Sequence, residues 1–98
     1  MKKKPLRDGG QPLVSVLIPI YNVEKYLDQC LASLAAQTIK DAEFICINDG
    51  STDGCLAIIQ SYMKRDKRFK LLDKANSGYG DSMNQGLKKA RGKYIGIV

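Results

Sequence analysis

Short apolar segments alternate with amphipathic helical segments along almost the whole of this chain. Segments rich in β-branched and apolar residues are typical of strands buried on both faces, and they occupy residues 13–20, 42–48, 69–72 and 94–98. Between them, apolar side chains recur with helical spacing over residues 23–35, after Ser51, and from Ser82 to Ala90. This alternation constrains the fold more than any other feature of the sequence.

Strands and helices that alternate with short connections predict βαβ units, in which parallel strands form one sheet with helices on its faces. We therefore expect an α/β fold: a Rossmann-like three-layer α/β/α arrangement of four parallel strands in the order 3-2-1-4. The helices are expected to begin near Val23, Ser51 and Gly80. Ninety-eight residues suffice for a single core of this kind.

Three residues indicate how the helices are capped and packed. Asn22 stands where a cap is expected before the first helix. Gly92 follows the third helix, where a left-handed stop is expected. Gly86 lies within that helix at a cost of about 1 kcal/mol relative to alanine, so we expect it to allow close packing against the sheet.

The formal charge of +6 is concentrated near the N-terminus. Residues 1–11 contain Lys2, Lys3, Lys4 and Arg7 against Asp8, and we interpret them as a basic flexible leader. Such an arm is compatible with contact to nucleic acid or to an anionic membrane, or with a merely solvated tail. No apolar stretch follows that would indicate a signal peptide or a membrane helix, so we expect a cytoplasmic protein.

The chain has three cysteines without metal-ligand spacing and has no histidine. Reduced, mostly buried thiols are the simplest interpretation of Cys30, Cys46 and Cys55. A zinc site and a Ser-His-Asp triad are therefore not expected.

The residues with the most distinctive chemistry fall in three loops, 20–23, 49–53 and 76–80, at the predicted carboxyl ends of strands. Ligands bind at that edge of open parallel sheets. The loop Asp49-Gly50-Ser51-Thr52-Asp53 combines a possible phosphate cradle of N–H groups with an acidic acceptor for a base or ribose group. Taken alone, it is equally well a turn with a helix cap.

The other two loops also permit two interpretations. Tyr21, after Pro19, offers a stacking wall for a flat base, or simply packs where the strand ends. Gly78 and Gly80 indicate close backbone approach or a left-handed turn. Their spacing matches neither a Walker motif nor a dinucleotide fingerprint.

In order, these elements resemble the inverting family 2 glycosyltransferases, which have the GT-A nucleotide-diphospho-sugar transferase fold. The resemblance covers residues 12–98 and includes V-S-V-L-I-P-I-Y-N at 14–22 and I-N-D-G-S-T-D at 47–53. It implies that Tyr21 lies against the base, that Asp49 hydrogen-bonds uracil or another base, and that Pro19 shapes the pocket. The nucleotide-binding residues implied by the motifs together are Pro19, Tyr21, Asn22, Asp49, Gly50, Ser51, Asp53, Asn76, Gly78 and Asn84.

Two departures from the family pattern qualify this expectation. Many relatives have an arginine near the diphosphate at the position of Met83, and Asp81, Lys88 and Lys89 do not obviously replace it. The family's acidic motif, which holds Mn²⁺ or Mg²⁺, is expected after Val98. We therefore expect residues 12–98 to be the nucleotide-sugar-binding part of a truncated domain, with no catalytic residue, no metal ligand and no bound cofactor in this chain.

The resemblance implies an enzyme that transfers a hexosyl or N-acetylhexosaminyl group from a nucleotide sugar, UDP-linked by preference, to a glycan, lipid or protein. The alternative is a non-catalytic nucleotide-binding or assembly module derived from the same fold. Nucleic acid is not an expected partner, because we interpret the basic residues of 64–70 as a solvated helix end without an aromatic platform, and Phe69 opens the third predicted strand. We also expect a homo-oligomer through the fourth strand or its flanks, and we consider peripheral membrane contact of the full-length protein.

Overall fold

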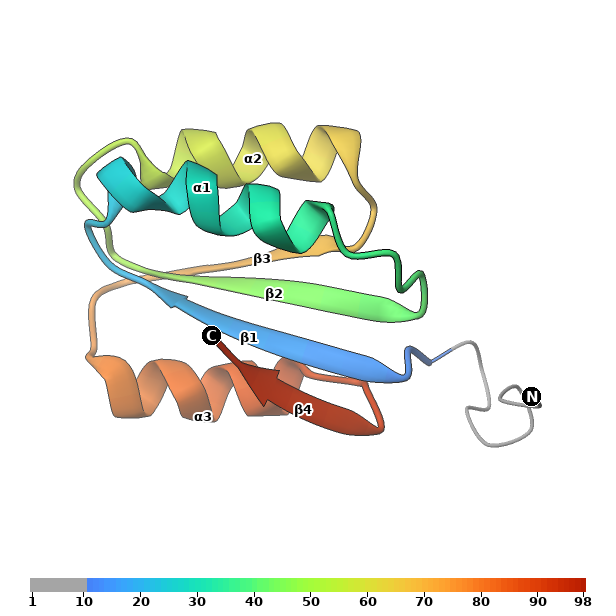
Figure 1. Ribbon diagram of the computed structural model, residues 1–98. Coiled ribbons are helices and arrows are strands. Elements are labelled where there is room, and N and C mark those ends of the chain that lie inside the picture. Colours follow the sequence, from blue (N-terminus) through green and yellow to red (C-terminus); the bar gives the residue numbers. More distant parts are fainter. Residues whose placement is uncertain (1–10) are drawn as a thin grey trace.

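The computed structural model describes residues 11–98 (Figure 1). The predicted basic leader falls almost entirely on residues 1–10, which lie outside the described residues. Strands and helices alternate strictly within the described part. The elements are β1 (Val14–Ile20), α1 (Glu24–Ala35), β2 (Ala42–Asp49), α2 (Cys55–Arg65), β3 (Phe69–Lys74), α3 (Tyr79–Lys89) and β4 (Tyr94–Ile97).

The strands form one parallel sheet in the order β3-β2-β1-β4, which confirms the predicted topology. Val14 of β1 pairs with Ala42 on one side and with Tyr94 on the other. Figure 1 shows α1 and α2 on one face of the sheet and α3 on the opposite face. All carboxyl ends of the strands therefore meet at one edge, the carboxyl edge, and all amino ends at the other, the amino edge.

Each face of the sheet has its own apolar cluster. The larger lies under α1 and α2 and includes Phe44 and Phe69, whose rings meet edge to face at 5.0 Å. The smaller lies under α3 and contains Leu17, Ile45, Ile47 and Met83. β2 is buried along its whole length because it is central in the sheet and covered on both faces.

Three expectations about the helices are wrong. The second helix begins at Cys55, four residues after Ser51, because residues 51–54 form a loop held by side chains from the first βα connection. Asn22 does not cap α1; Val23 occupies that position, and Asn22 instead has a left-handed backbone with φ 49°. Tyr26, placed on the apolar face of α1 by its spacing, is exposed.

Of the two predictions about glycines, the one for Gly86 is confirmed and the one for Gly92 is wrong. Gly86 allows close packing as expected, since a Cβ there would lie 2.6 Å from Cδ1 of Ile47. Gly92 does not end α3 in a left-handed conformation. Glycine is required at this position because a Cβ there would lie 2.5 Å from the backbone nitrogen of Ser15.

The three cysteines are free thiols, as expected. Burial raises the pKa of Cys46 to about 12, so this thiol stays protonated at neutral pH. Among the helices of residues 11–98, none is long and apolar enough to cross a membrane.

Candidate functional site

A cavity of about 330 Å³ opens at the carboxyl edge, where the loops after β1, β2 and β3 meet. Its walls come from the end of β1, the end of β2 and the start of α3. The lining residues are Pro19, Ile20, Tyr21, Asp49, Asn76, Gly78, Tyr79 and Ser82. Ligand sites of open α/β sheets occur at this edge.

Asp49, the last residue of β2, is the most constrained polar group of the cavity. One carboxylate oxygen accepts the N–H of Ser77 at 2.8 Å, and the other accepts the N–H of Gly78 at 3.0 Å. Lys74 Nζ donates to the first oxygen at 2.5 Å. These hydrogen bonds, led by the one from Lys74, lower the pKa of the Asp49 carboxyl, so it is ionised at neutral pH.

Lys74 is a residue that the sequence analysis missed. It is the last residue of β3, pairs with Asp49 in the sheet register, and has only 7% of its side chain exposed. Besides Asp49, its ammonium group donates to Ser77 Oγ, to the carbonyl of Ala75 and to Ser82 Oγ. The sequence signal that could have identified Lys74 is the presence of an acidic and a basic residue at the carboxyl ends of neighbouring parallel strands.

A second network joins the first two loops. Asn22 Oδ1 accepts the N–H of Thr52 at 2.8 Å, while the N–H of Asn22 donates to Ser51 Oγ at 3.0 Å. Asp53 accepts the N–H groups of Glu24 and Cys55 through separate oxygens. These contacts hold the loops after β1 and β2 together beside the cavity.

This network changes the interpretation of the loop 49–53. Its proposed role as a phosphate cradle needs free N–H donors, but the N–H of Thr52 is bonded to Asn22 and that of Gly54 to Glu24. The N–H of Cys55, at the start of α2, is bonded to Asp53. Three donors of the expected cradle are therefore already satisfied by side chains.

The predicted site residues divide into two groups. Those that line the cavity are Pro19, Tyr21, Asp49, Asn76 and Gly78. Those that do not line it are Asn22, Gly50, Ser51, Asp53 and Asn84. The first four of the second group lie in the supporting loops, and Asn84 is exposed on α3.

Gly50 and Asn76 hold the loops after β2 and β3 in close contact. Asn76 donates its side-chain amide to the carbonyl of Asp49 at 3.0 Å. Gly50 has φ 71°, and a Cβ there would lie 2.6 Å from the backbone nitrogen of Asn76. Only glycine combines that backbone conformation with so close an approach.

Two exposed tyrosines, Tyr21 and Tyr79, border the cavity. Tyr21 follows β1 and is 51% exposed, and Tyr79 begins α3 and is 63% exposed. Tyr79 was not singled out from the sequence. Aromatic side chains left this exposed at a cavity suit stacking on a flat ring.

The position at which many relatives have arginine points into the core of this chain. Met83 is only 8% exposed and packs with Leu17, Ile45 and Ile47 between α3 and the sheet. Lys88 and Lys89 lie in the last turn of α3, at the amino edge, far along the helix from the cavity. Neither lysine compensates for the missing arginine.

Within residues 11–98, no three Asp, Glu, Cys or His side chains are grouped so that they could hold a metal ion. The three hydrogen bonds accepted by Asp49 leave about one of its four acceptor sites open. The described residues alone therefore do not fit a metal site.

Comparison with known proteins places these features in a family. The family model described as Glycosyl transferase family 2 matches residues 15–98. The uncharacterized glycosyltransferase EpsJ of Bacillus subtilis is 46% identical over 87 residues, which cover 89% of this chain and 25% of EpsJ. The chain thus spans about a quarter of the length of this relative.

Solved structures show the same fold. S. aureus TarS 1-349 in complex with UDP superposes with a TM-score of 0.81 at 33% identity, over 88% of this chain and 26% of TarS. The mannosyltransferase PcManGT from Pyrobaculum calidifontis, in complex with GDP-Man and Mn²⁺, superposes with a TM-score of 0.78 at 21% identity. The match covers 87% of this chain and 26% of that enzyme. The predicted GT-A architecture is confirmed.

Proposed function

The chain belongs to glycosyl transferase family 2, and we propose that it forms the nucleotide-binding part of an enzyme that transfers a sugar from a UDP-linked donor. The cavity beside Asp49 and Tyr21, at the carboxyl edge of the sheet, is the observation that carries this proposal. The UDP complex of TarS, at 33% identity, supports uracil as the base. The transferred group is a hexose or N-acetylhexosamine, and the acceptor is a glycan, lipid or protein.

The chemistry of Asp49 is suited to uracil. Its carboxylate is ionised and fixed by two backbone N–H groups and Lys74, and one acceptor site remains. Uracil presents a ring N–H donor, whereas cytosine presents an acceptor at that position. A fixed anion at the cavity wall therefore selects uracil over cytosine, because an unpaired acceptor facing it is repelled.

The two tyrosines contribute differently from the carboxylate. Tyr21 and Tyr79 offer ring faces, which any base can stack on, so they add affinity without choosing the base. α3 begins at Tyr79, so its free N–H groups and positive dipole end lie beside the cavity, where they favour the diphosphate. We propose both roles: base stacking by the two tyrosines and diphosphate binding at the start of α3.

Mn²⁺ or Mg²⁺ in the longer enzyme also remains a prediction. Its ligands would come from outside the residues described here, since those residues offer no suitable group. Such an ion supplies positive charge to the diphosphate when bound. A cytoplasmic location likewise stays a prediction.

Calorimetric titration tests the site. The 98-residue chain with Mn²⁺ should bind UDP weakly and CDP more weakly still, and Asp49→Asn should reduce UDP binding roughly tenfold or more while removing the preference over CDP. Tyr21→Ala should weaken both nucleotides alike. Tyr26→Ala, on exposed α1 surface away from the cavity, is the matched control. Unchanged UDP binding in Asp49→Asn would remove the base-reading role.

A further inference from the structure

The charges of this molecule are separated between the two edges of its sheet. The sequence has 16 Lys and Arg residues, four of them in residues 1–10, and of the other twelve only Lys25 and Lys74 lie away from the amino edge. The amino edge carries Lys40, Lys64, Arg65, Lys67, Arg68, Lys70, Lys88, Lys89, Arg91 and Lys93. The acids of this edge are Asp41, Glu43 and Asp66.

Helix stability explains part of this separation. Lys64 and Arg65 lie in the last turn of α2, and Lys88 and Lys89 in the last turn of α3, where the helix dipole favours positive charge. Arg68 is also accounted for, since it pairs with Asp66 and donates to three carbonyls at and after the end of α1. The remaining cations need another explanation.

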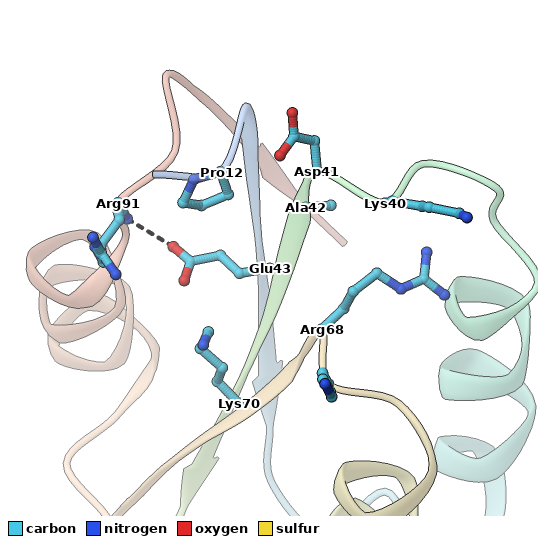
Figure 2. Close-up of a pocket in the computed structure, with 9 residues that line it drawn as sticks. Pro12, Lys40, Asp41, Ala42, Glu43, Arg68, Lys70 and Arg91 are labelled. Atoms are coloured by element: carbon cyan, nitrogen blue, oxygen red, sulfur yellow. Dashed lines mark hydrogen bonds between the residues drawn. The ribbon is translucent and has the colours of Figure 1, made fainter. Parts of the chain in front are cut away.

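Four of the five remaining cations surround a hollow of about 230 Å³ at the amino edge (Figure 2), and the fifth, Lys93, lies over the ring of Tyr94 at 5.6 Å. Lys40, Lys67, Lys70 and Arg91 reach the hollow from the segments that begin β2, β3 and β4. All four side chains are exposed, and no carboxylate of residues 11–98 forms an ion pair with any of them. We call these four residues the basic rim.

The floor of the hollow argues against a small anion inside it. Glu43 is 2% exposed there, and its carboxylate accepts the hydroxyl of Ser15 at 2.6 Å and the N–H of Arg91 at 2.7 Å. Figure 2 shows Lys70 and Arg91 near the Glu43 carboxylate. A phosphate seated on the floor would meet this negative charge, whereas an extended anionic surface would meet only the rim.

The first residues of the sequence are basic and join the described chain at the same edge. Pro12 lines the hollow, and residues 1–10 join the described chain one residue before it. Those ten residues contain Lys2, Lys3, Lys4 and Arg7 against one acid. Their attachment point therefore lies at the basic rim, at the edge opposite the proposed nucleotide cavity.

We propose that the amino edge docks on an anionic lipid bilayer through the basic rim, with the nucleotide cavity directed away from the membrane. Clusters of four to eight exposed Lys and Arg residues bind anionic headgroups, each adding about a fivefold factor in affinity near the surface. The cations come from several segments at one edge of the sheet, which suits a broad surface. The proposed contact is peripheral, because it is made by exposed side chains of one surface.

Vesicle co-sedimentation of the 98-residue chain tests this surface. The chain should bind phosphatidylglycerol vesicles and not phosphatidylcholine vesicles, and about 1 M salt should release it, because the screening length falls to about 3 Å. The variant Lys40→Gln/Lys67→Gln/Lys70→Gln should bind at least tenfold more weakly. The control Lys25→Glu/Gln29→Glu makes the same change in net charge on exposed α1 surface and should bind like the parent.

Several results would overturn the proposal. Equal binding of the triple variant and the parent excludes the basic rim. Loss of binding only when Lys2, Lys3 and Lys4 are changed to glutamine assigns it to residues 1–10 alone. Duplex DNA that competes fully at the same salt concentration and equal charge would indicate a general polyanion surface instead.

Discussion

Gly92 lies against the backbone of β1, where a methyl group has no space. Its N–H donates to Ser15 Oγ at 2.7 Å, and a Cβ would fall 2.5 Å from the Ser15 nitrogen. Because the obstacle is main chain, the strand itself must shift. We expect Gly92→Ala to lower the free energy of unfolding by about 2 to 3 kcal/mol in urea denaturation.

Gly80 is the matched case in which a methyl group should help. It lies in the first turn of α3 with no atom within 4 Å of an added Cβ, and its φ is not positive. Alanine there reduces the entropy of the unfolded chain, so Gly80→Ala should raise stability by about 0.5 to 1 kcal/mol. A loss of similar size in both variants would contradict the packing argument.

The Asp49–Lys74 pair predicts a dependence of stability on pH. The folded state lowers the pKa of Asp49, chiefly through Lys74, so the unfolded chain binds this proton more readily. The stabilisation is therefore present above the ordinary carboxyl pKa of about 3.9 and is lost as pH falls through the lower folded value.

Denaturation in urea between pH 7 and pH 2 tests this. Lys74→Met should reduce the steepness of the acid-side loss, because the pKa of Asp49 then returns toward its ordinary range. Lys70→Met removes an exposed lysine from the same strand and should leave the profile unchanged. If both variants keep the parent's steepness, Lys74 does not hold the carboxylate.

At the scale of elements, Arg68 replaces the C-terminal cap that α1 lacks in its own sequence. α1 has no basic residue in its last turn, and the Arg68 guanidinium donates to the carbonyls of Ala35, Gln37 and Ile39 at 2.6 to 3.0 Å. Asp66 fixes the guanidinium from the other side. One side chain thus joins the end of α1 to the start of β3.

Lysine in place of Arg68 keeps the positive charge but cannot form the several hydrogen bonds that the planar guanidinium donates. We expect Arg68→Lys to lower the free energy of unfolding by about 2 kcal/mol, since several carbonyls lose a charged donor. Arg65→Lys, at an exposed position, should change stability by less than about 0.5 kcal/mol. Equal effects of the two substitutions would show that Arg68 acts only as a surface charge.

The strands and their parallel pairing followed from the sequence because burial patterns and βαβ crossovers obey general rules. The start of α2 did not follow, because it depends on contacts from Asn22 and Glu24, about 30 residues earlier. The cavity wall was predicted in part. Asp49 and Tyr21 lie in loops that the motifs identify, whereas the role of Lys74 depends on its pairing with Asp49 in the neighbouring strand. Local patterns thus indicate elements, and tertiary hydrogen bonds decide loops.

At the scale of the whole molecule, the sheet has two unlike edges and two outer strands, β3 and β4. The carboxyl edge holds the proposed nucleotide cavity, and the amino edge carries the basic rim. β4 pairs with β1, and within residues 11–98 no strand pairs with its outer side. Tyr94, Ile95 and Ile97 of this strand are between 44% and 58% exposed.

Such a strand is a template for pairing with a second copy, because its outer N–H and C=O groups have no partner strand and its side chains are apolar. We expect the 98-residue chain to self-associate at roughly tens of micromolar, as measured by light scattering. Ile95→Lys should shift the population toward monomer, since a charge on an edge strand opposes pairing. Met63→Lys, a comparable change on α2 across the sheet, should leave the association unchanged. A monomeric parent chain at that concentration would show that the outer side of β4 is not an association surface.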